Sequence, residues 1–188
     1  MKKKIIDLLS EDIEVKRALI KTQAKAIEAL ARMMLSTIRS GHKILIFGNG
    51  GSAADSMHLA AELVGRFRKE RRPIPAIALT ENAPLLTALG NDYSFDYIFE
   101  RQVEGLGKKG DMALGISTSG KSKNVARGIL KASKMRLKTA VLTGGLKGPL
   151  SRIADISISV PSVNTPRIQE SHIAIIHIVC EIVENALR

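Results

Sequence analysis

The chain has 188 residues, of which 45% are hydrophobic and 25% charged, so it carries enough apolar material for a buried core. This composition excludes an intrinsically disordered chain, and the length predicts one domain. Aromatic residues make up only 3%, with no tryptophan, which argues against the stacking platforms of single-strand nucleic-acid binders. The formal net charge of +11 suits an anionic small substrate, nucleic acid, a membrane surface, or simply solvated lysines.

Compartment and membrane association are constrained by a few local features. The single cysteine, Cys180, permits no intrachain disulfide, which suits a reducing compartment, and we expect it to be a small core residue. The N-terminal segment has lysines but no apolar stretch of the signal-peptide kind. The apolar run from Ile173 to Cys180 is interrupted by His177 and is far shorter than the ~20 residues of a membrane span. We therefore expect a cytoplasmic protein that does not bind a membrane.

The first forty residues carry apolar side chains at helical spacing, which predicts one or two long amphipathic helices. Such an arm has little to pack on by itself, so we expect a partner subunit to cover its apolar face. The predicted organisation is a single domain over residues 1–188, in which residues 1–40 form a helical arm at a subunit interface.

From residue 43 onward, short apolar runs alternate with helical segments. Strands are predicted at 43–48, 76–79, 112–116, 139–142 and 156–160. Helical segments are predicted at 53–66, 84–89, 95–106, 122–135 and 166–187. This alternation is typical of the α/β class, with a doubly wound parallel sheet of five strands flanked by helices. Ligands of such sheets bind beyond the carboxyl ends of the strands, so the loops after those ends are the candidate functional segments.

Two of these loops have compositions suited to an anion. The first, Gly48-Asn49-Gly50-Gly51-Ser52, opens a helix, where backbone N–H groups can approach a phosphate, although a tight turn explains it equally well. It matches neither the dinucleotide-binding pattern nor a Walker loop. The second loop contains four hydroxyl side chains, Ser117, Thr118, Ser119 and Ser122. Helix capping accounts for one of the four, so phosphate binding is favoured for this loop.

Two helices carry candidate residues for proton transfer or metal binding. His58 and Glu62 are spaced i,i+4 and share a helix face, where they could bind a metal or handle protons, although a plain surface pair is more common. His177 lies in an apolar stretch of the last helix, and by itself this position predicts a core histidine. Gln169 is about 80° from His177 around the helix, whereas His172 is about 140° away, so His172 and His177 do not easily face one site.

Together these segments resemble the signatures of the phosphoheptose isomerase family, which has the sugar isomerase (SIS) fold. The glycine turn is followed by His58-Leu59-Ala60-Ala61-Glu62-Leu63-Val64-Gly65-Arg66-Phe67. The later matching segments are Gly90-Asn91-Asp92, Gly115 to Gly120 with Ser122, Leu142-Thr143-Gly144, and Arg167-Ile168-Gln169-Glu170 with His172 and His177. The match keeps the family's order and spacing from about residue 35 to the end of the chain.

The resemblance implies an aldose–ketose isomerase that converts sedoheptulose 7-phosphate to D-glycero-D-manno-heptose 7-phosphate, for lipopolysaccharide core or other surface glycans by way of ADP- or GDP-heptose. It also implies a homotetramer with active sites between subunits. Glu62 and His177 would be the catalytic pair, and a zinc ion would be bound by His58, Glu62, Gln169 and His177. The implied substrate contacts are Asn49, Gly50, Gly51, Ser52, Glu62, Asn91, Asp92, Ser117, Thr118, Ser119, Ser122 and Gln169.

Two other hypotheses compete with an isomerase. A non-catalytic SIS protein that senses a sugar phosphate or binds a replication initiator would share the glycine and serine loops, but the presence of Glu62 and His177 favours an enzyme. Nucleic-acid binding is the least favoured, because the basic charge is scattered and no helix-turn-helix, zinc-finger or RNA-binding signature is present. The segments Gly144–Lys147 and Arg68–Arg72 depart from the family pattern, and the sequence does not predict what they change.

Overall fold

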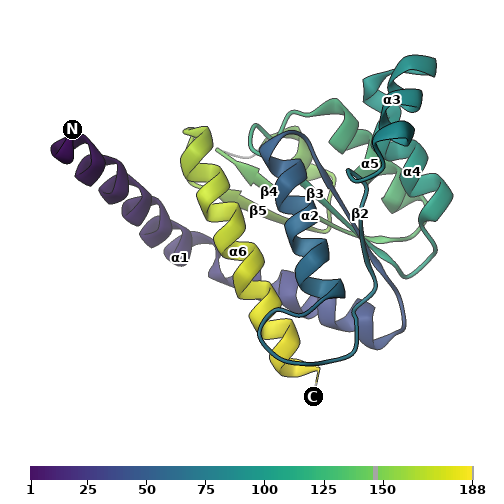
Figure 1. The fold of residues 1–188 in the computed structure, drawn as a ribbon, viewed down its shortest axis with the longest axis horizontal. Helices are drawn as coiled ribbons and strands as arrows, with labels where there is room; N and C mark the ends of the chain where they lie inside the picture. The colour runs from purple at the N-terminus through teal and green to yellow at the C-terminus, as the bar shows by residue number, and fades with distance from the viewer. Residues whose placement is uncertain (146–147, 188) are drawn as a thin grey trace.

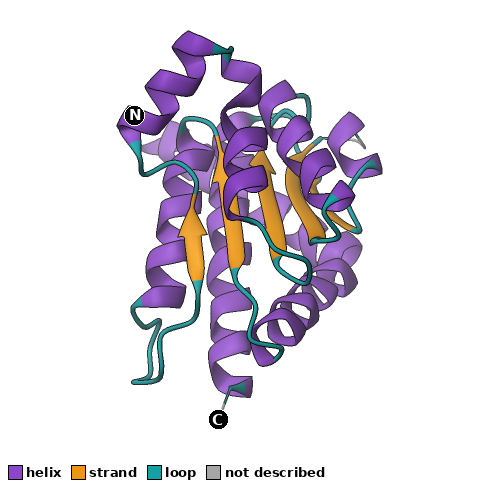
Figure 2. Ribbon diagram, turned by 90° about the vertical axis from the view of Figure 1, so that its right-hand side faces the viewer, coloured by secondary structure: helices purple, strands orange, loops and turns teal. Residues whose placement is uncertain are grey.

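The computed structural model describes residues 1–145 and 148–187 and contains a five-stranded parallel sheet. The strands are β1 (Ile44–Gly48), β2 (Ala76–Ala78), β3 (Met112–Ser117), β4 (Lys138–Gly144) and β5 (Ile156–Val160). Their order is β2-β1-β3-β4-β5, and each neighbouring pair runs parallel. Figure 2 shows the carboxyl ends of the strands along the same edge of the sheet. The predicted α/β class and parallel sheet are confirmed.

Helices cover both faces of this sheet (Figures 1 and 2). They are α1 (Lys2–Arg39), α2 (Gly51–Val64), α3 (Ala83–Asp92), α4 (Ile98–Leu106), α5 (Lys123–Lys134) and α6 (Thr165–Ala186). Two short 3-10 turns, Phe95–Tyr97 and Pro149–Arg152, complete the described elements. The helical segment predicted from residue 95 therefore starts as a 3-10 turn, and the arm predicted as one or two helices is one.

Two buried clusters follow from the alternation of side chains along the strands. On one face, Ile44 and Ile46 of β1 pack with the second half of α1, with α2 and with α6. On the other face, Leu45 and Phe47 pack with α4 and α5. Cys180 is 2% exposed within the first cluster, as predicted for a small core residue. Both faces of the central strands are thus apolar, which explains why these strands appear in the sequence as continuous apolar runs.

The sheet reverses its strand order at β1, which is paired with β2 on one side and with β3 on the other. The chain therefore leaves β1 and β3 toward opposite faces, and a crevice opens between the two connections. Gly48 ends β1 at this point, where a Cβ atom would lie 2.7 Å from the carbonyl oxygen of Ile116. The glycine and serine loops consequently meet at the switch point of the sheet.

The arm formed by α1 is only half covered. Most apolar side chains from Leu19 onward join the core, although Ile20 is 69% exposed. Ile5, Leu9 and Ile13 are each at least half exposed. Figure 1 shows this N-terminal half standing away from the body of the molecule. The predicted amphipathic arm is confirmed as a helix, and its outer apolar side chains lack cover in the described chain.

Candidate active site

The centre of the candidate site lies where α2 faces α6. The Nε2 atoms of His58 and His177 are 3.0 Å apart, and His58 Nε2 lies 3.3 Å from Glu62 Oε1. The shared face of His58 and Glu62 is therefore confirmed. The interpretation of His177 as a core histidine is wrong, because its side chain turns toward α2 while Ile176 and Val179 fill the core.

The site is accessible from solvent, as a site for a polar substrate must be. The side chain of His58 is 43% exposed and that of Glu62 is 22% exposed. Phe67, in the loop after α2, contributes an apolar wall, since its ring centroid lies 5.7 Å from that of His177. The imidazole of His177 is thus placed between an aromatic ring and a second imidazole, whose centroid is 5.1 Å away.

Gln169 lies two turns before His177 on α6 and packs on the glycine turn. A Cβ atom on Gly51 would overlap Gln169 Nε2, so only glycine leaves this amide its space. Gly50, which precedes it, has a φ of 56°, a conformation that glycine adopts at little cost. The angular separation predicted from helix geometry is consistent with this arrangement, since Gln169 and His177 both contact residues of α2.

The serine loop lies beside the end of β4. Ser117 Oγ and Ser122 Oγ are 2.9 Å apart, and the backbone N–H of Lys121 donates to Ser119 Oγ at 3.2 Å. Ser122 precedes α5 without a capping hydrogen bond from its side chain, so helix capping does not explain these hydroxyls. A cavity of about 300 Å³ adjoins the loop. Its lining residues are Thr118, Ser119, Lys121, Gly144, Gly145, Ser162, Val163, Thr165 and Ile168.

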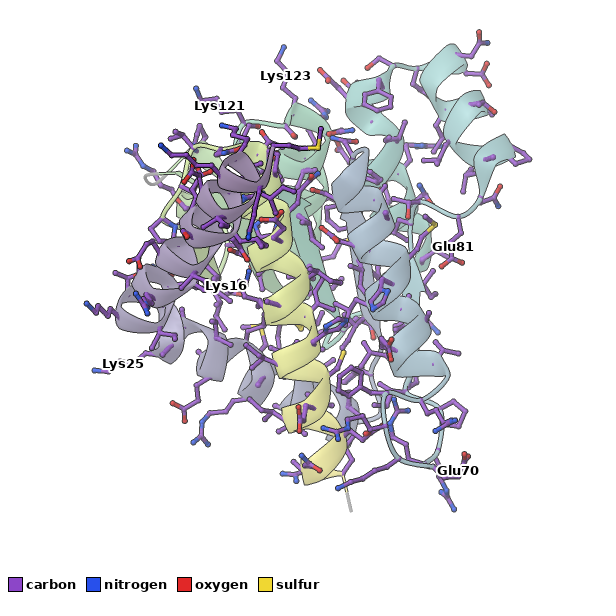
Figure 3. The ribbon with its side chains drawn as sticks, turned by 60° about the vertical axis from the view of Figure 1, so that its left-hand side comes forward. Lys16, Lys25, Glu70, Glu81, Lys121 and Lys123 are labelled. Carbon is purple, nitrogen blue, oxygen red and sulfur yellow. The ribbon has the colours of Figure 1, made fainter. Side chains whose placement is uncertain are left out.

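This cavity has the character of an anion site. Among its described lining residues Lys121 is the only charged one, and four of the others carry hydroxyl side chains. Figure 3 shows Lys121 and Lys123 close together at one end of the molecule, with Lys123 opening α5. Hydroxyl donors with one nearby cation suit a phosphate group.

The remaining predicted substrate contacts are placed less uniformly. Asn49 exchanges two side-chain hydrogen bonds of 2.9 Å with Asn124, which ties the glycine turn to the start of α5. Ser52 is 3% exposed and packed within the turn, so its side chain has little access to a ligand. Asn91 donates to Asp92 Oδ1 at 2.9 Å, and both are exposed at the end of α3. Within the described residues, no hydrogen bond joins either of them to the other candidate site residues.

Two titratable residues near the site, half-buried Asp55 and buried His172, were given no role by the sequence, and Asp55 was not named at all. Asp55 precedes His58 by one helical turn, and burial raises the pKa of its carboxyl to about 6, against an opposing effect of the His58 charge. His172 is fully buried and Nε2 lies 3.1 Å from the carbonyl oxygen of Thr143. Burial lowers the pKa of His172 to about 4, so the ring is neutral and donates from Nε2. Helical spacing from His58 could have found Asp55, whereas the contact of His172 depends on tertiary packing.

The zinc ion that the resemblance implies requires donor atoms at defined spacings. Over residues 1–145 and 148–187, no group of three or more His, Cys, Asp or Glu side chains is arranged to hold a metal. His58 is nonetheless 3.0 Å from one potential ligand atom and 3.3 Å from another, and adjacent ligands of tetrahedral zinc are roughly 3.3 Å apart. Imidazole, carboxylate and amide oxygen are also suitable zinc ligands. The His58–His177 and His58–Glu62 separations fit zinc, whereas the amide of Gln169 lies against Gly51 at the start of α2.

Most of the chain matches a known domain family. Residues 9–144 match the SIS domain family model, which agrees with the doubly wound parallel sheet and the serine loop at its switch point. The fold and site therefore define a SIS-domain protein. None of the described helices combines the length and apolarity needed to cross a bilayer.

The particular family follows from individual relatives. The chain is 52% identical over 185 residues to phosphoheptose isomerase of Aquifex aeolicus (strain VF5), covering 98% of this chain and 97% of that relative. The phosphoheptose isomerase structure from Neisseria gonorrhoeae superposes with a TM-score of 0.93 at 37% identity, covering 98% and 99% of the two chains. The phosphoheptose isomerase structure from Francisella tularensis superposes with a TM-score of 0.94 at 38% sequence identity, covering 97% of each chain. The chain belongs to the phosphoheptose isomerase family, and it is an enzyme of the isomerase class.

Proposed function

We propose that the enzyme interconverts sedoheptulose 7-phosphate and D-glycero-D-manno-heptose 7-phosphate. The observation that carries this proposal is the convergence of Glu62, His58 and His177 between α2 and α6. The names of the relatives support the choice of a heptose phosphate. The hydroxyl-lined cavity beside the serine loop supports a phosphorylated substrate.

The reaction moves a proton between two adjacent carbons through an enediol. A base removes a proton from C1 of the ketose while an acid protonates the carbonyl oxygen at C2, and the proton is then returned to C2 as the hydroxyl at C1 becomes a carbonyl. Glu62 is suited to act as the base and His177 as the acid, because they come from different helices and can act from opposite sides of the enediol. The non-catalytic hypothesis requires these two side chains to be far apart or dispensable. Both lie within 3.3 Å of His58, which argues against the first condition, and the variants described below test the second.

Phosphate binding fixes the substrate for this chemistry. Ser117, Thr118, Ser119 and Ser122 would donate hydrogen bonds to the phosphate, while Asn49, Gly50, Gly51, Asn91, Asp92 and Gln169 would contact the sugar. Ser52 would do so only through its backbone, because its side chain is 3% exposed. Binding energy from the remote phosphate holds the reacting carbons against the base, which favours the reaction through positioning. The serine loop and Glu62 belong to separate elements, so the phosphate can stay bound at the loop while the carbon atoms of the sugar react at Glu62.

We further propose a zinc ion held by His58, Glu62, Gln169 and His177. When bound, zinc would polarise the oxygen atoms of the carbonyl or enediolate. Glu62 would then be both ligand and base, and coordination weakens a carboxylate as a free base. Turnover before and after chelation, with zinc content measured on the same samples, decides the matter. Full activity in zinc-free protein would remove the ion from the mechanism.

The assembly that we propose is a cytoplasmic homotetramer with sites completed between subunits, which supplies heptose for lipopolysaccharide or other surface glycans. The exposed apolar side chains of α1 support an oligomer, because exposed apolar patches of this kind mark protein interfaces.

The experiment that tests the activity is turnover of sedoheptulose 7-phosphate by the purified protein, with Glu62→Gln and His177→Gln measured alongside. We expect the wild type to form the aldose and both variants to lose at least about a thousandfold in kcat while staying folded. An inert wild type, with and without added zinc, would contradict the proposed function. An active Glu62→Gln variant would remove Glu62 from its role as the base.

A further inference from the structure

A buried carboxylate near the end of α6 binds the loop that follows α2. Glu184 is 6% exposed, and its two oxygens accept hydrogen bonds from three consecutive backbone N–H groups. The donors are Phe67 at 3.1 Å, Arg68 at 2.9 Å and Lys69 at 3.0 Å. Burial alone would raise the pKa of Glu184, but these N–H groups and Arg71 outweigh it and lower the pKa. The carboxylate is therefore charged at neutral pH.

Arg71 connects the same carboxylate to the last turn of α2. Its Nε lies 3.3 Å from Glu184 Oε1, an ion pair without hydrogen-bond geometry, and its side chain is 10% exposed. The guanidinium donates from Nη2 to the carbonyl oxygen of Glu62 at 2.6 Å and from Nη1 to that of Leu63 at 2.8 Å. One arginine of the basic segment is thus turned inward and satisfies carbonyl groups at the end of a helix.

These contacts converge on the helices that carry the candidate active site. Arg71 holds the backbone of Glu62, and Glu184 holds the backbone of Phe67, whose ring packs on His177. Glu184 follows His177 by seven residues, or two helical turns, so both point from one side of α6. Figure 3 labels Glu70 in this loop, at the opposite end of the molecule from Lys121 and the serine loop.

We propose that Glu184 and Arg71 act together as positioning residues for Glu62 and His177, and we name them the Glu184–Arg71 clamp. The clamp sets the spacing of α2 and α6 at the reacting side chains, through the backbone of Glu62 and through Phe67. The kinetic part of this inference rests on the proposed isomerase function. Small displacements matter, because a shift of about 1 Å in a catalytic group can cost up to about a hundredfold in rate.

The kinetic test uses Glu184→Gln and Arg71→Lys. Glutamine replaces one acceptor oxygen by an NH2 group that faces N–H donors, and lysine cannot bridge two carbonyl groups and a carboxylate. We expect kcat to fall about tenfold in each variant with KM within about twofold, because the substrate contacts remain. The matched control is Glu181→Gln, which removes the exposed Arg68–Glu181 pair between the same loop and helix and should leave kcat unchanged.

A second control separates positioning from loss of stability. Asp111 is likewise a buried carboxylate that accepts backbone N–H groups, from Lys43 and Lys108, at the start of β3 and away from the site. Asp111→Asn should lower the unfolding midpoint as Glu184→Gln does, yet retain kcat at a temperature where both variants are folded. Equal kcat losses in the two variants, or none in Glu184→Gln, would overturn the proposal.

A readout that needs no turnover completes the test. NMR of the intact protein follows the ring resonances of His177 and the amide exchange of Phe67, Arg68 and Lys69. We expect Glu184→Gln to accelerate exchange at these amides and to shift the His177 ring resonances, while Glu181→Gln does neither. Faster exchange with unmoved His177 resonances would overturn the clamp's positioning role. An inert wild type would instead reject the proposed function, and the ring resonances would still decide the clamp.

Discussion

At the scale of single residues, burial shifts the pKa values of two groups beside the site in opposite directions, because it favours the neutral form of each. The folded pKa of His172 lies below its ordinary value of 6.5, so on acidification the unfolded chain takes up the proton first and unfolding becomes easier. Asp55 has a folded pKa above its ordinary value of 3.8, so between that value and about 6 acidification favours the folded chain. His172 is therefore neutral near pH 7, whereas Asp55 takes up its proton as the pH falls toward about 6.

Replacing His172 by glutamine should make stability less dependent on pH. Between pH 7 and pH 5 the wild type should lose about 2 kcal/mol of unfolding free energy because of His172, and this part should vanish in His172→Gln, which keeps a donor for the Thr143 carbonyl oxygen. Urea unfolding midpoints of both proteins at pH 7 and pH 5 measure the difference. Parallel pH profiles for the two proteins would contradict the assignment.

Lys121 should contribute charge to substrate binding and nothing to the chemical step. Lys121→Ala is expected to raise KM for the sugar phosphate about five- to tenfold with kcat unchanged, since Lys121 lines the hydroxyl-rich cavity. Lys123→Ala is the matched control, because Lys123 lies two residues on and does not line that cavity. Steady-state kinetics at two salt concentrations measure KM and kcat of the two variants. Equal effects of the two substitutions would show a diffuse charge effect only.

At the scale of elements, the site is a product of how α2 and α6 face each other. The i,i+4 spacing of His58 and Glu62 could be predicted from the sequence because it depends on one helix alone. The 3.0 Å approach of His177 could not, because it depends on the packing of two helices more than one hundred residues apart in the chain. For the same reason the apolar neighbours of His177 in the sequence led to the wrong prediction of a core histidine. Those neighbours lie on the core side of α6, whereas His177 lies on the side that faces α2.

The same limit applies to the rest of the chain. Strand and helix positions followed from periodicity and glycine boundaries, and the five-strand sheet followed from their alternation. The role of Arg71 could not be predicted, because a basic segment in the sequence does not show which arginine turns inward. Of the segments that depart from the family pattern, Leu146 and Lys147 lie outside the described residues.

The approach of α6 to the glycine turn predicts a specific effect of Gly51→Ala. The new methyl group would overlap Gln169 Nε2, which is the flexible end of a side chain and can rotate away. We expect the melting temperature to change by less than about 3 °C while kcat/KM falls about tenfold or more. Gly105→Ala, with open space around its Cβ position in α4, is the control and should leave kcat/KM unchanged while raising the melting temperature slightly, because alanine favours a helix over glycine. Unchanged kcat/KM in Gly51→Ala would show that Gln169 need not occupy this place.

At the scale of the whole molecule, the outer half of α1 has no cover within the described chain. Ile5, Leu9 and Ile13 lie on this arm and are 53%, 60% and 50% exposed. Because about half of each side chain is already covered, burying the rest would stabilise an interface by roughly 0.8–1.5 kcal/mol each. In the proposed homotetramer, the arm would therefore link the stability of the assembly to the activity of the shared site.

Placing charge on the arm should break the oligomer. The double variant Leu9→Glu with Ile13→Glu is expected to sediment as a smaller species than the wild type and to lose most of its turnover, because carboxylates in an apolar interface are costly to bury. Lys25→Glu, on the same helix and labelled in Figure 3, is the control and should keep the wild-type size. Sedimentation velocity at matched concentrations measures this. An unchanged sedimentation coefficient in the double variant would place the interface elsewhere.

Proton transfer by Glu62 is the central chemical claim, and isotope incorporation tests it most directly. The measurement is NMR of sedoheptulose 7-phosphate incubated with the enzyme in D2O. We predict an aldose product with deuterium at C2, because Glu62 is 22% exposed and its proton exchanges with solvent, and no product with Glu62→Gln. Failure to form the aldose, or an aldose that carries only protium at C2, would contradict the account.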